Sequence, residues 1–189
     1  SARFYYPRGI TTDGTNVYVS DTNNHMIRKI VISTGAVTTL AGSTSSGSTD
    51  ATGTSARFNY PRGITIDGTN LYVSDANAHV IRKVVIASGE VSILAGAEYA
   101  LGHNDATGAD ARFRTPAGIT TDGTNLYVAE MGNSVIRKIV IETAEVTTLA
   151  GVPGEAGSTD SFDYQTGQPT TATTLTTKFS NTSKMERYK

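Results

Sequence analysis

Residues 7–21 read Pro-Arg-Gly-Ile-Thr-Thr-Asp-Gly-Thr-Asn-Val-Tyr-Val-Ser-Asp, and nearly the same stretch returns at 61–75 and again at 116–130. The short segments Ala-Arg-Phe, Ile-Arg-Lys and Leu-Ala-Gly recur around it in the same order. The phenylalanines of the Ala-Arg-Phe segments stand at positions 4, 58 and 113, which are 54 and then 55 residues apart. A sustained internal period of this kind indicates a repeat architecture, with one structural unit per repeat.

Each repeat predicts four short strands. In the first copy we expect them over 9–12, 17–20, 26–32 and 37–40. The Asp-Gly-Thr-Asn segment is a tight-turn signal between the first two strands, and no segment shows the 3.6-residue apolar period of a helix. The third strand is apolar on both faces, which is typical of a sheet covered on both sides. Radially repeated four-stranded antiparallel sheets that cover one another form an all-β propeller. The rival is a solenoid, whose repeats are usually shorter and do not need three hairpin turns each.

We expect three blades over about 1–54, 55–109 and 110–161, followed by a Thr-rich extension over 162–189. Long Gly/Ser/Thr-rich loops join the blades. Residues 162–189 lack the repeat motifs. They are either a disordered linker or a connector that adds a strand to an exposed sheet edge.

Composition narrows the range of functions. The 189 residues carry a net charge of −1, which gives no long-range attraction for nucleic acid or anionic lipid. Cysteine is absent, which excludes disulfides and thiolate metal sites. No apolar run reaches the length of a membrane helix, so we expect neither a nucleic-acid partner nor membrane insertion. Residue 1 falls inside a repeat unit, and we expect that upstream sequence has been removed.

Residues 18–28, together with the frame Pro-x-Gly-Ile, Ile-Arg-Lys and Leu-Ala-Gly, resemble the NHL repeat. The Asn-His-Leu triplet that names the family reads Asn24-His25-Met26 here, then Ala78-His79-Val80, then Asn133-Ser134-Val135. The resemblance covers residue 1 to about 161 and is strongest to long secreted or surface arrays of bacteria. It implies a six-bladed propeller, of which three blades are half.

An open half-ring would expose two apolar blade faces, and monomers rarely tolerate patches that large. We therefore expect a protein partner. The simplest is a second identical chain that closes the ring head to tail, and a contact that does not close gives a filament. Alternatively, the chain is a fragment of a longer propeller.

The repeats also contain a recurring acid and a recurring arginine. They stand seven residues apart on adjacent antiparallel strands, so we expect a structural pair in each blade. The acids are Asp21, Asp75 and Glu130, and the arginines are Arg28, Arg82 and Arg137.

Histidines occupy one repeat position in the first two copies, as His25 and His79, while the third copy has Ser134. Amidating lyases use an NHL-like propeller with a histidine-lined metal site, and this resemblance implies metal binding as an alternative role for these residues. Such a metal site needs several histidines that converge on the central channel of the propeller. The two histidines here stand instead at the turn into the third strand. We expect structural hydrogen bonds for them.

Two further groups are candidate ligand residues. Asp50, Asp105 and Asp160 recur in the Gly-rich loops, where they cap the loop or, with help from other oxygens, bind calcium. Arg8 and Arg62 follow the proline that opens the innermost strand, where they could line one mouth of the channel and grip an anionic ligand.

The polar positions repeat in nearly every copy, whereas a catalytic site breaks repeat symmetry. We therefore expect no catalytic residues and no cofactor, and a non-enzymatic extracellular or cell-surface module for protein–protein contact or self-assembly. Two alternatives stay open: an NHL-type metal-dependent lyase or hydrolase, and a ligand-binding sensor fragment.

Overall fold

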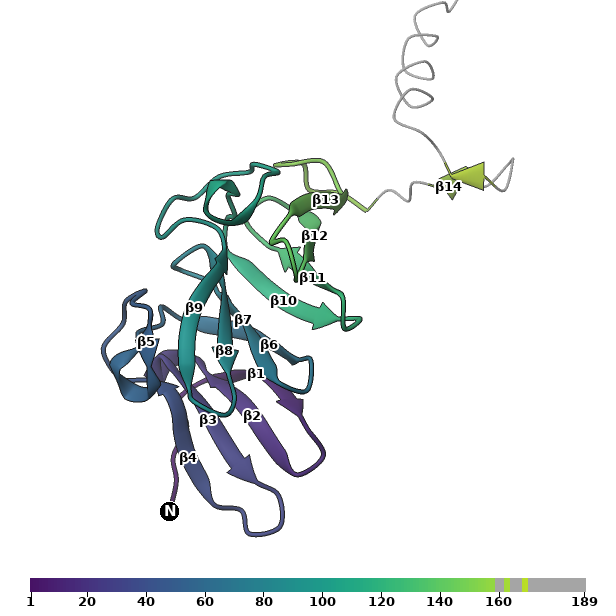
Figure 1. Cartoon of the computed structure of the whole chain (residues 1–189). Helices are drawn as coiled ribbons and strands as arrows, with labels where there is room; N and C mark the ends of the chain where they lie inside the picture. The colour runs from purple at the N-terminus through teal and green to yellow at the C-terminus, as the bar shows by residue number, and fades with distance from the viewer. Residues whose placement is uncertain (159–161, 164–167, 170–189) are drawn as a thin grey trace, which may run out of the picture. The chain divides into compact units, whose positions relative to one another are not determined.

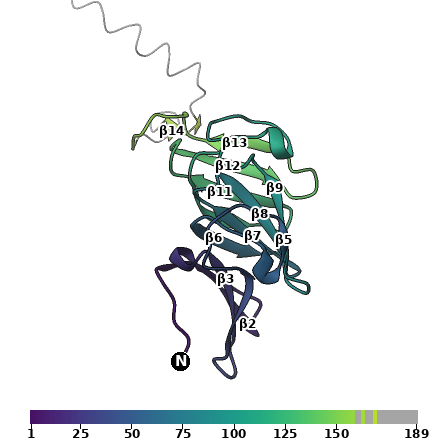
Figure 2. The same cartoon turned by 90° about the vertical axis from the view of Figure 1, so that its left-hand side faces the viewer.

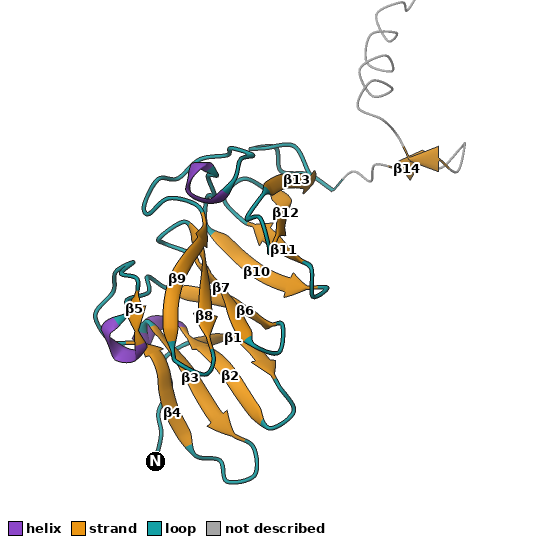
Figure 3. Cartoon of the chain, viewed as in Figure 1, coloured by secondary structure: helices purple, strands orange, loops and turns teal. Residues whose placement is uncertain are grey.

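The computed structural model describes residues 1–158, 162–163 and 168–169, which are organised as antiparallel β-sheet (Figures 1 and 3). Contacts divide the chain into two units, Ser1–Glu155 and Ala156–Lys189. The first unit contains three blades of four consecutive strands each. The fold is therefore the all-β arrangement of three four-stranded blades that the repeat predicted.

Strand order within each blade follows the chain. Blade 1 consists of β1 (Pro7–Thr12), β2 (Asn16–Asp21), β3 (Met26–Val31) and β4 (Val37–Gly42). Blade 2 consists of β6 (Pro61–Ile66), β7 (Asn70–Asp75), β8 (Val80–Val85) and β9 (Glu90–Ala95). Blade 3 consists of β10 (Pro116–Thr121), β11 (Asn125–Glu130), β12 (Val135–Val140) and β13 (Val146–Ala150). Figure 2 shows the three blades as successive layers.

The Asp-Gly-Thr-Asn turns connect the first and second strands through the aspartate side chain. In blade 1 the Asp13 carboxylate accepts the backbone N–H groups of Thr15 at 2.8 Å and Asn16 at 2.5 Å. These bonds and the Asn16 side chain hold the pKa of Asp13 well below its usual range. The Tyr18 hydroxyl donates to the same carboxylate at 2.9 Å, and burial together with this bond raises the pKa of Tyr18 to about 12. Asp67 and Asp122 make the same set of bonds in the other blades. The motif recurs because each copy needs this turn.

Apolar side chains fill the space between successive blades, and a phenylalanine lies in each of these cores. Phe58 and Phe113 are completely buried. Phe58 packs in a cluster that joins blade 1 to blade 2, with Tyr18, Ile27, Ala41, Leu71 and Val73 among its members. Phe113 packs in the equivalent cluster between blades 2 and 3, with Tyr72, Ile81, Ala95, Leu126 and Val128. Blade 2 thus covers blade 1, and blade 3 covers blade 2, which is the propeller arrangement.

The innermost strands approach one another closely at the glycine of the Pro-x-Gly-Ile segment. β6 contacts both β1 and β10. A Cβ atom on Gly9 would overlap the carbonyl oxygen of Arg62, and one on Gly63 would overlap that of Ala117. A Cβ on Gly118 would meet only the Ala129 side chain, at 3.6 Å. Glycine is therefore required at 9 and 63 by the next blade, and not at 118 by any described residue.

The loops between blades lie along the outer edge of the blade that follows them. β5 (Ala51–Thr52) pairs with β9, so it adds a short fifth strand to the outer edge of blade 2. The turns η2 (Gly53–Ser55) and η3 (Gly108–Asp110) follow the same path, and Thr107 bridges to Glu145 of blade 3. Each loop therefore leaves one blade and lies on the outer edge of the next. The third turn, η1 (Thr22–Asn24), lies inside blade 1.

The second unit begins at Ala156. Its described strands are β14 (Phe162–Asp163) and β15 (Gln168–Pro169), which pair with each other antiparallel. Most of the Thr-rich extension lies outside the described residues, so its role as a strand-adding connector stays a prediction. Among the described residues, no helix is long and apolar enough to cross a membrane.

We predict that Gly63→Ala destabilises the chain while Gly118→Ala does not. The new methyl group at 63 meets a backbone carbonyl that cannot move without displacing blade 3, which should lower the free energy of unfolding by about 1–3 kcal/mol or more. Urea denaturation in dilute solution measures both variants. Equal effects of the two substitutions would contradict the close approach of β6 and β10.

Candidate functional site

A buried ion pair joins the second and third strands of every blade. Arg28 lies 3.0 Å from Asp21, Arg82 lies 3.3 Å from Asp75, and Arg137 lies 2.8 Å from Glu130. The three carboxylates and the side chains of Arg82 and Arg137 are completely buried, whereas Arg28 is 14% exposed. These are the acid–arginine partners that the sequence placed together.

The same groups hold the Ala-Arg-Phe segment of their own blade. In blade 2, Asp75 accepts the N–H of Asn59 at 2.7 Å, and Arg82 donates to the carbonyl oxygen of Arg57 at 3.0 Å. The Arg82 guanidinium also lies over the Phe58 ring, 5.2 Å from its centroid, in a cation–π geometry. We call this set of bonds to the acid and the arginine the clamp, because it fixes the phenylalanine on both sides.

The clamp recurs in the other two blades. In blade 1, Tyr5 N–H donates to Asp21, and Arg28 donates to Arg3 and lies 5.3 Å from the Phe4 ring centroid. The blade 3 clamp holds Phe113 through Glu130 and Arg137. The clamp holds the phenylalanine that packs against the preceding blade in blades 2 and 3. The bonds of these polar residues therefore serve a structural role.

An amide donor supports the buried acid in only two blades. Asn24 donates to Asp21 at 2.9 Å, and Asn133 donates to Glu130. The equivalent position of blade 2 is Ala78, which leaves Asp75 without this donor. Burial raises the pKa of Asp75 to about 7, because desolvation outweighs the attraction of Arg82.

The loop aspartates complete the arginine bonding in blades 2 and 3. Asp50 lies 2.6 Å from Arg82 and accepts the N–H of Ile93 at 3.1 Å. Asp105 pairs with Arg137 at 2.6 Å and accepts the N–H of Thr148 at 2.8 Å. Burial opposes ionisation of Asp105, but the bonds from Thr148 and the charge of Arg137 outweigh it, so its pKa is lowered.

The sequence predicted loop capping or a weak calcium site for these aspartates and did not predict their arginine partners. Asp50 and Asp105 come from the loop that enters a blade and bind an arginine about 30 residues later, a spacing with no local signal. Asp160 lies outside the described residues. Within the described ranges, no three His, Cys, Asp or Glu side chains gather in a group that could hold a metal ion.

The histidines connect neighbouring blades. His25 and His79 both adopt left-handed backbone conformations, with φ of 57° and 63°. The Nδ1 atom of His25 accepts the N–H of Tyr60 at 3.2 Å, and that of His79 accepts the N–H of Thr115 at 3.2 Å. Burial lowers the pKa of both imidazoles, which favours the neutral form that accepts these bonds.

Arg8 and Arg62 lie together at the inner strands, beside a concave space of about 370 Å³. Arg62 also contacts the Met131 sulfur at 3.2 Å. Burial and the positive charge of Arg8 both lower the pKa of Arg62. Their place at a channel mouth and anion binding there both stay predictions.

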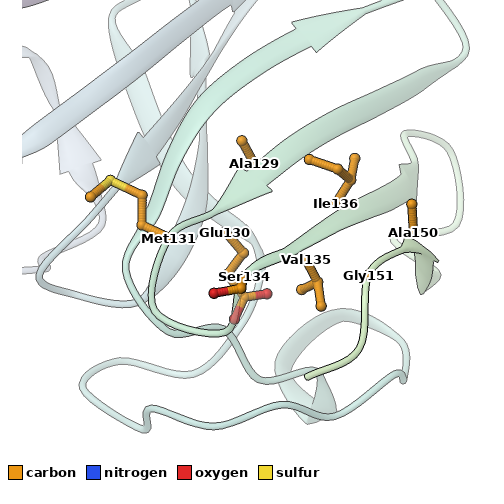
Figure 4. Close-up of a pocket in the computed structure, with 8 residues that line it drawn as sticks. All are labelled: Ala129, Glu130, Met131, Ser134, Val135, Ile136, Ala150 and Gly151. Atoms are coloured by element: carbon orange, nitrogen blue, oxygen red, sulfur yellow. The ribbon is translucent and has the colours of Figure 1, made fainter. Parts of the chain in front are cut away.

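The open face of blade 3 contains a pocket of about 250 Å³, which we call the socket (Figure 4). It lies between the end of β11, the start of β12 and the end of β13, at residues 129–131, 134–136 and 150–151. Its lining is mostly apolar, with the Glu130 carboxylate and the Ser134 hydroxyl at one side (Figure 4).

The same place is occupied by phenylalanine in the other two blades. A Cβ on Gly42 would approach the Phe58 ring to 2.9 Å, and one on Gly96 would approach the Phe113 ring to 3.0 Å. At the third equivalent, Gly151, the three nearest atoms to such a Cβ belong to Ser134 and Val135 instead of a phenylalanine. Ile136 is 38% exposed, whereas its equivalents Ile27 and Ile81 are completely buried. The sequence predicted an exposed apolar face but not this socket, although the missing fourth Ala-Arg-Phe was a signal for it.

Three radial blades with these interfaces define a segment of a β-propeller, and solved structures share this fold. A protein of unknown function from Bacteroides thetaiotaomicron matches with a TM-score of 0.62 and 32% identity, over 66% of this chain and 32% of that one. A chain of the nidogen–laminin complex matches with a TM-score of 0.58 and 20% identity, over 78% of this chain and 48% of that one. Virginiamycin B lyase from Staphylococcus aureus matches with a TM-score of 0.52 and 19% identity, over 78% of this chain and 42% of that one.

Curated relatives identify the repeat, although no family model matches the chain. NHL repeat-containing protein 2 of Homo sapiens is 31% identical over 121 residues, which is 58% of this chain and 16% of that protein. SUPPRESSOR OF QUENCHING 1, a chloroplastic protein of Arabidopsis thaliana, is 30% identical over 159 residues, which is 79% of this chain and 15% of that protein. These similarities support the NHL-repeat family for the blades of this chain, which spans about 15% of the length of these relatives.

We predict that Arg82→Met destabilises the chain more than Arg28→Met. Asp75 would keep a single donor, the Asn59 N–H, while Asp21 would keep Tyr5 N–H and Asn24. Leaving a buried charge without its partner costs about 3–5 kcal/mol, and the cost at Asp21 should be smaller. Urea denaturation of the two variants measures the difference in the free energy of unfolding. A larger loss of stability for Arg28→Met than for Arg82→Met would contradict this account of the donors that remain to Asp75 and Asp21.

We predict that Ala78→Asn stabilises the chain at neutral pH by supplying the missing amide donor. The folded-state pKa of Asp75, about 7, lies above its ordinary value of 3.8, so its contribution to stability falls as pH rises from about 4 to 7. A donor to the ionised form lowers that pKa and reverses part of the fall. Thermal unfolding should therefore show a gain at pH 8 that disappears towards pH 4. Ala78→Leu, similar in shape to Asn but without a donor, should show no such dependence.

Proposed function

We propose that the chain is a non-enzymatic propeller module, extracellular or on the cell surface, that binds protein through its open blade faces. The observation that carries this proposal is the exposed apolar face of blade 3. Met131 and Ile136, which line the socket, are 61% and 38% exposed. Exposed apolar surface is typical of sites where proteins bind one another.

The use of the polar residues supports a binding role over catalysis. The buried acids, their arginines and the two bridging histidines are engaged in bonds that hold the blades together. A catalytic group needs a reacting partner within hydrogen-bond reach, whereas these groups already bind protein atoms. One solved structure that shares this fold is that of the nidogen–laminin complex, which is a protein–protein assembly.

The enzyme alternative rests on fold likeness. Virginiamycin B lyase and a phosphatase-like protein of Bacteroides thetaiotaomicron share the fold at 19% and 22% identity, which carries no activity to this chain. The placement outside the cell rests on the resemblance to secreted arrays. In the ligand-binding alternative, an anion would bind at Arg8 and Arg62 and neutralise their two neighbouring positive charges.

We predict that the chain forms particles larger than its own 19.9 kDa. Burial of the open faces drives the association, so the mass should rise with concentration and be retained in high salt. Light scattering on a sizing column measures this, with elemental analysis of the same peak. A particle that stays at the mass of one chain and holds one tightly bound divalent metal would contradict the proposal and favour the lyase alternative.

A further inference from the structure

We propose that the socket on blade 3 binds the Ala2-Arg3-Phe4 segment of a second copy of this chain. The inference rests on the proposed function and specifies the partner and the contact. The occupant is identified from the two interfaces within the chain, where the same apolar site takes the same tripeptide.

The internal interfaces show what fills this socket. In both of them an Ala-Arg-Phe segment places its ring against the glycine that ends the fourth strand of the preceding blade. Phe58 and Phe113 become completely buried by doing so, together with the alanines Ala56 and Ala111. The socket of blade 3 has the same glycine, Gly151, with φ of 94° against 88° and 93° at Gly42 and Gly96.

The N-terminal edge presents the third such segment in the same form. Phe4 is held by Arg28 at 5.3 Å, and the N–H of Tyr5 donates to Asp21 at 2.7 Å. Tyr6 has a φ of 50°, close to the 57° of Tyr60 and the 54° of Thr115 at the equivalent positions. The clamp therefore sets the segment in its binding conformation although no blade precedes it in the described structure, and little order is lost on binding.

The socket side is also compatible with this segment. Ser134 adopts a φ of 58°, which matches His25 and His79. Its hydroxyl can accept the Tyr6 N–H in the way that the imidazole nitrogens accept those of Tyr60 and Thr115. Gly118 likewise leaves room for a carbonyl oxygen, as Gly9 and Gly63 do within the chain.

The contact is head to tail, so each chain offers one segment and one socket. Two chains close a ring if the rotation between them completes it, and otherwise the chains extend as a filament. The ring and the filament use the same contact. A particle of finite mass indicates the ring rather than the filament.

The test compares the association of the wild-type chain with that of Phe4→Ala, by sedimentation velocity over a concentration series. The proposal expects at least a tenfold weaker association for Phe4→Ala. The control is Tyr99→Asn, which removes an exposed aromatic ring from an inter-blade loop outside both halves of the contact and should associate as the wild type does. Circular dichroism establishes that both variants fold. Association of Phe4→Ala equal to that of the wild type overturns this inference and leaves the proposed function standing, whereas a wild-type chain that stays monomeric overturns both.

A second variant blocks the opposite side of the contact. Ala129 is exposed at the socket, so Ala129→Gln fills it without disturbing the blade core. This variant alone should associate weakly. Mixed with Phe4→Ala, it should form a pair of one chain each, because its intact segment meets an intact socket. Failure of the mixture to pair overturns the proposal.

Discussion

The fold depends on the buried arginine–acid pair in each blade. Burying two charges is unfavourable unless further hydrogen bonds satisfy them, and here those bonds come from the backbone on either side of a phenylalanine. In blades 2 and 3 the pair therefore fixes a phenylalanine that packs against the preceding blade. Since Asp50 and Asp105 add a bond from the incoming loop, the same arginine also orders the outer edge of its blade. A single cation thus links the loop, the blade and the interface.

Much of the fold could be predicted because its signals are local. The Asp-Gly-Thr-Asn turns and the alternation of strands and turns recur within about 20 residues, and the structure has them where the sequence indicated. The strand limits were less accurate. β1 starts at Pro7 rather than Gly9, because Pro7 still pairs with Asp21 across a bulge. β4 reaches Gly42, because Gly42 pairs with Met26 beyond another register shift.

The parts that could not be predicted depend on contacts distant in sequence. The acid–arginine pairs lie on adjacent strands and were foreseen, whereas the Asp50–Arg82 pair joins a loop to a strand of the following blade. The loop that contains Asp50 also places β5 on the outer edge of blade 2. Nothing in the composition of that loop indicates this pairing. The bonds from His25 and His79 to the next blade likewise depend on how the blades pack. The socket exists because the third repeat has no described successor, which is a property of the whole array.

The central claim is that the N-terminal Ala-Arg-Phe segment and the blade 3 socket are two halves of one interface. The most direct measurement replaces Phe4 with a photoreactive benzoylphenylalanine in an isotopically labelled chain, mixes it with unlabelled chain, and maps the cross-links by mass spectrometry. The account predicts links between differently labelled chains, from position 4 to residues 129–136 and 150–151. Cross-links confined to a single chain, or directed to another surface of the second copy, would contradict it.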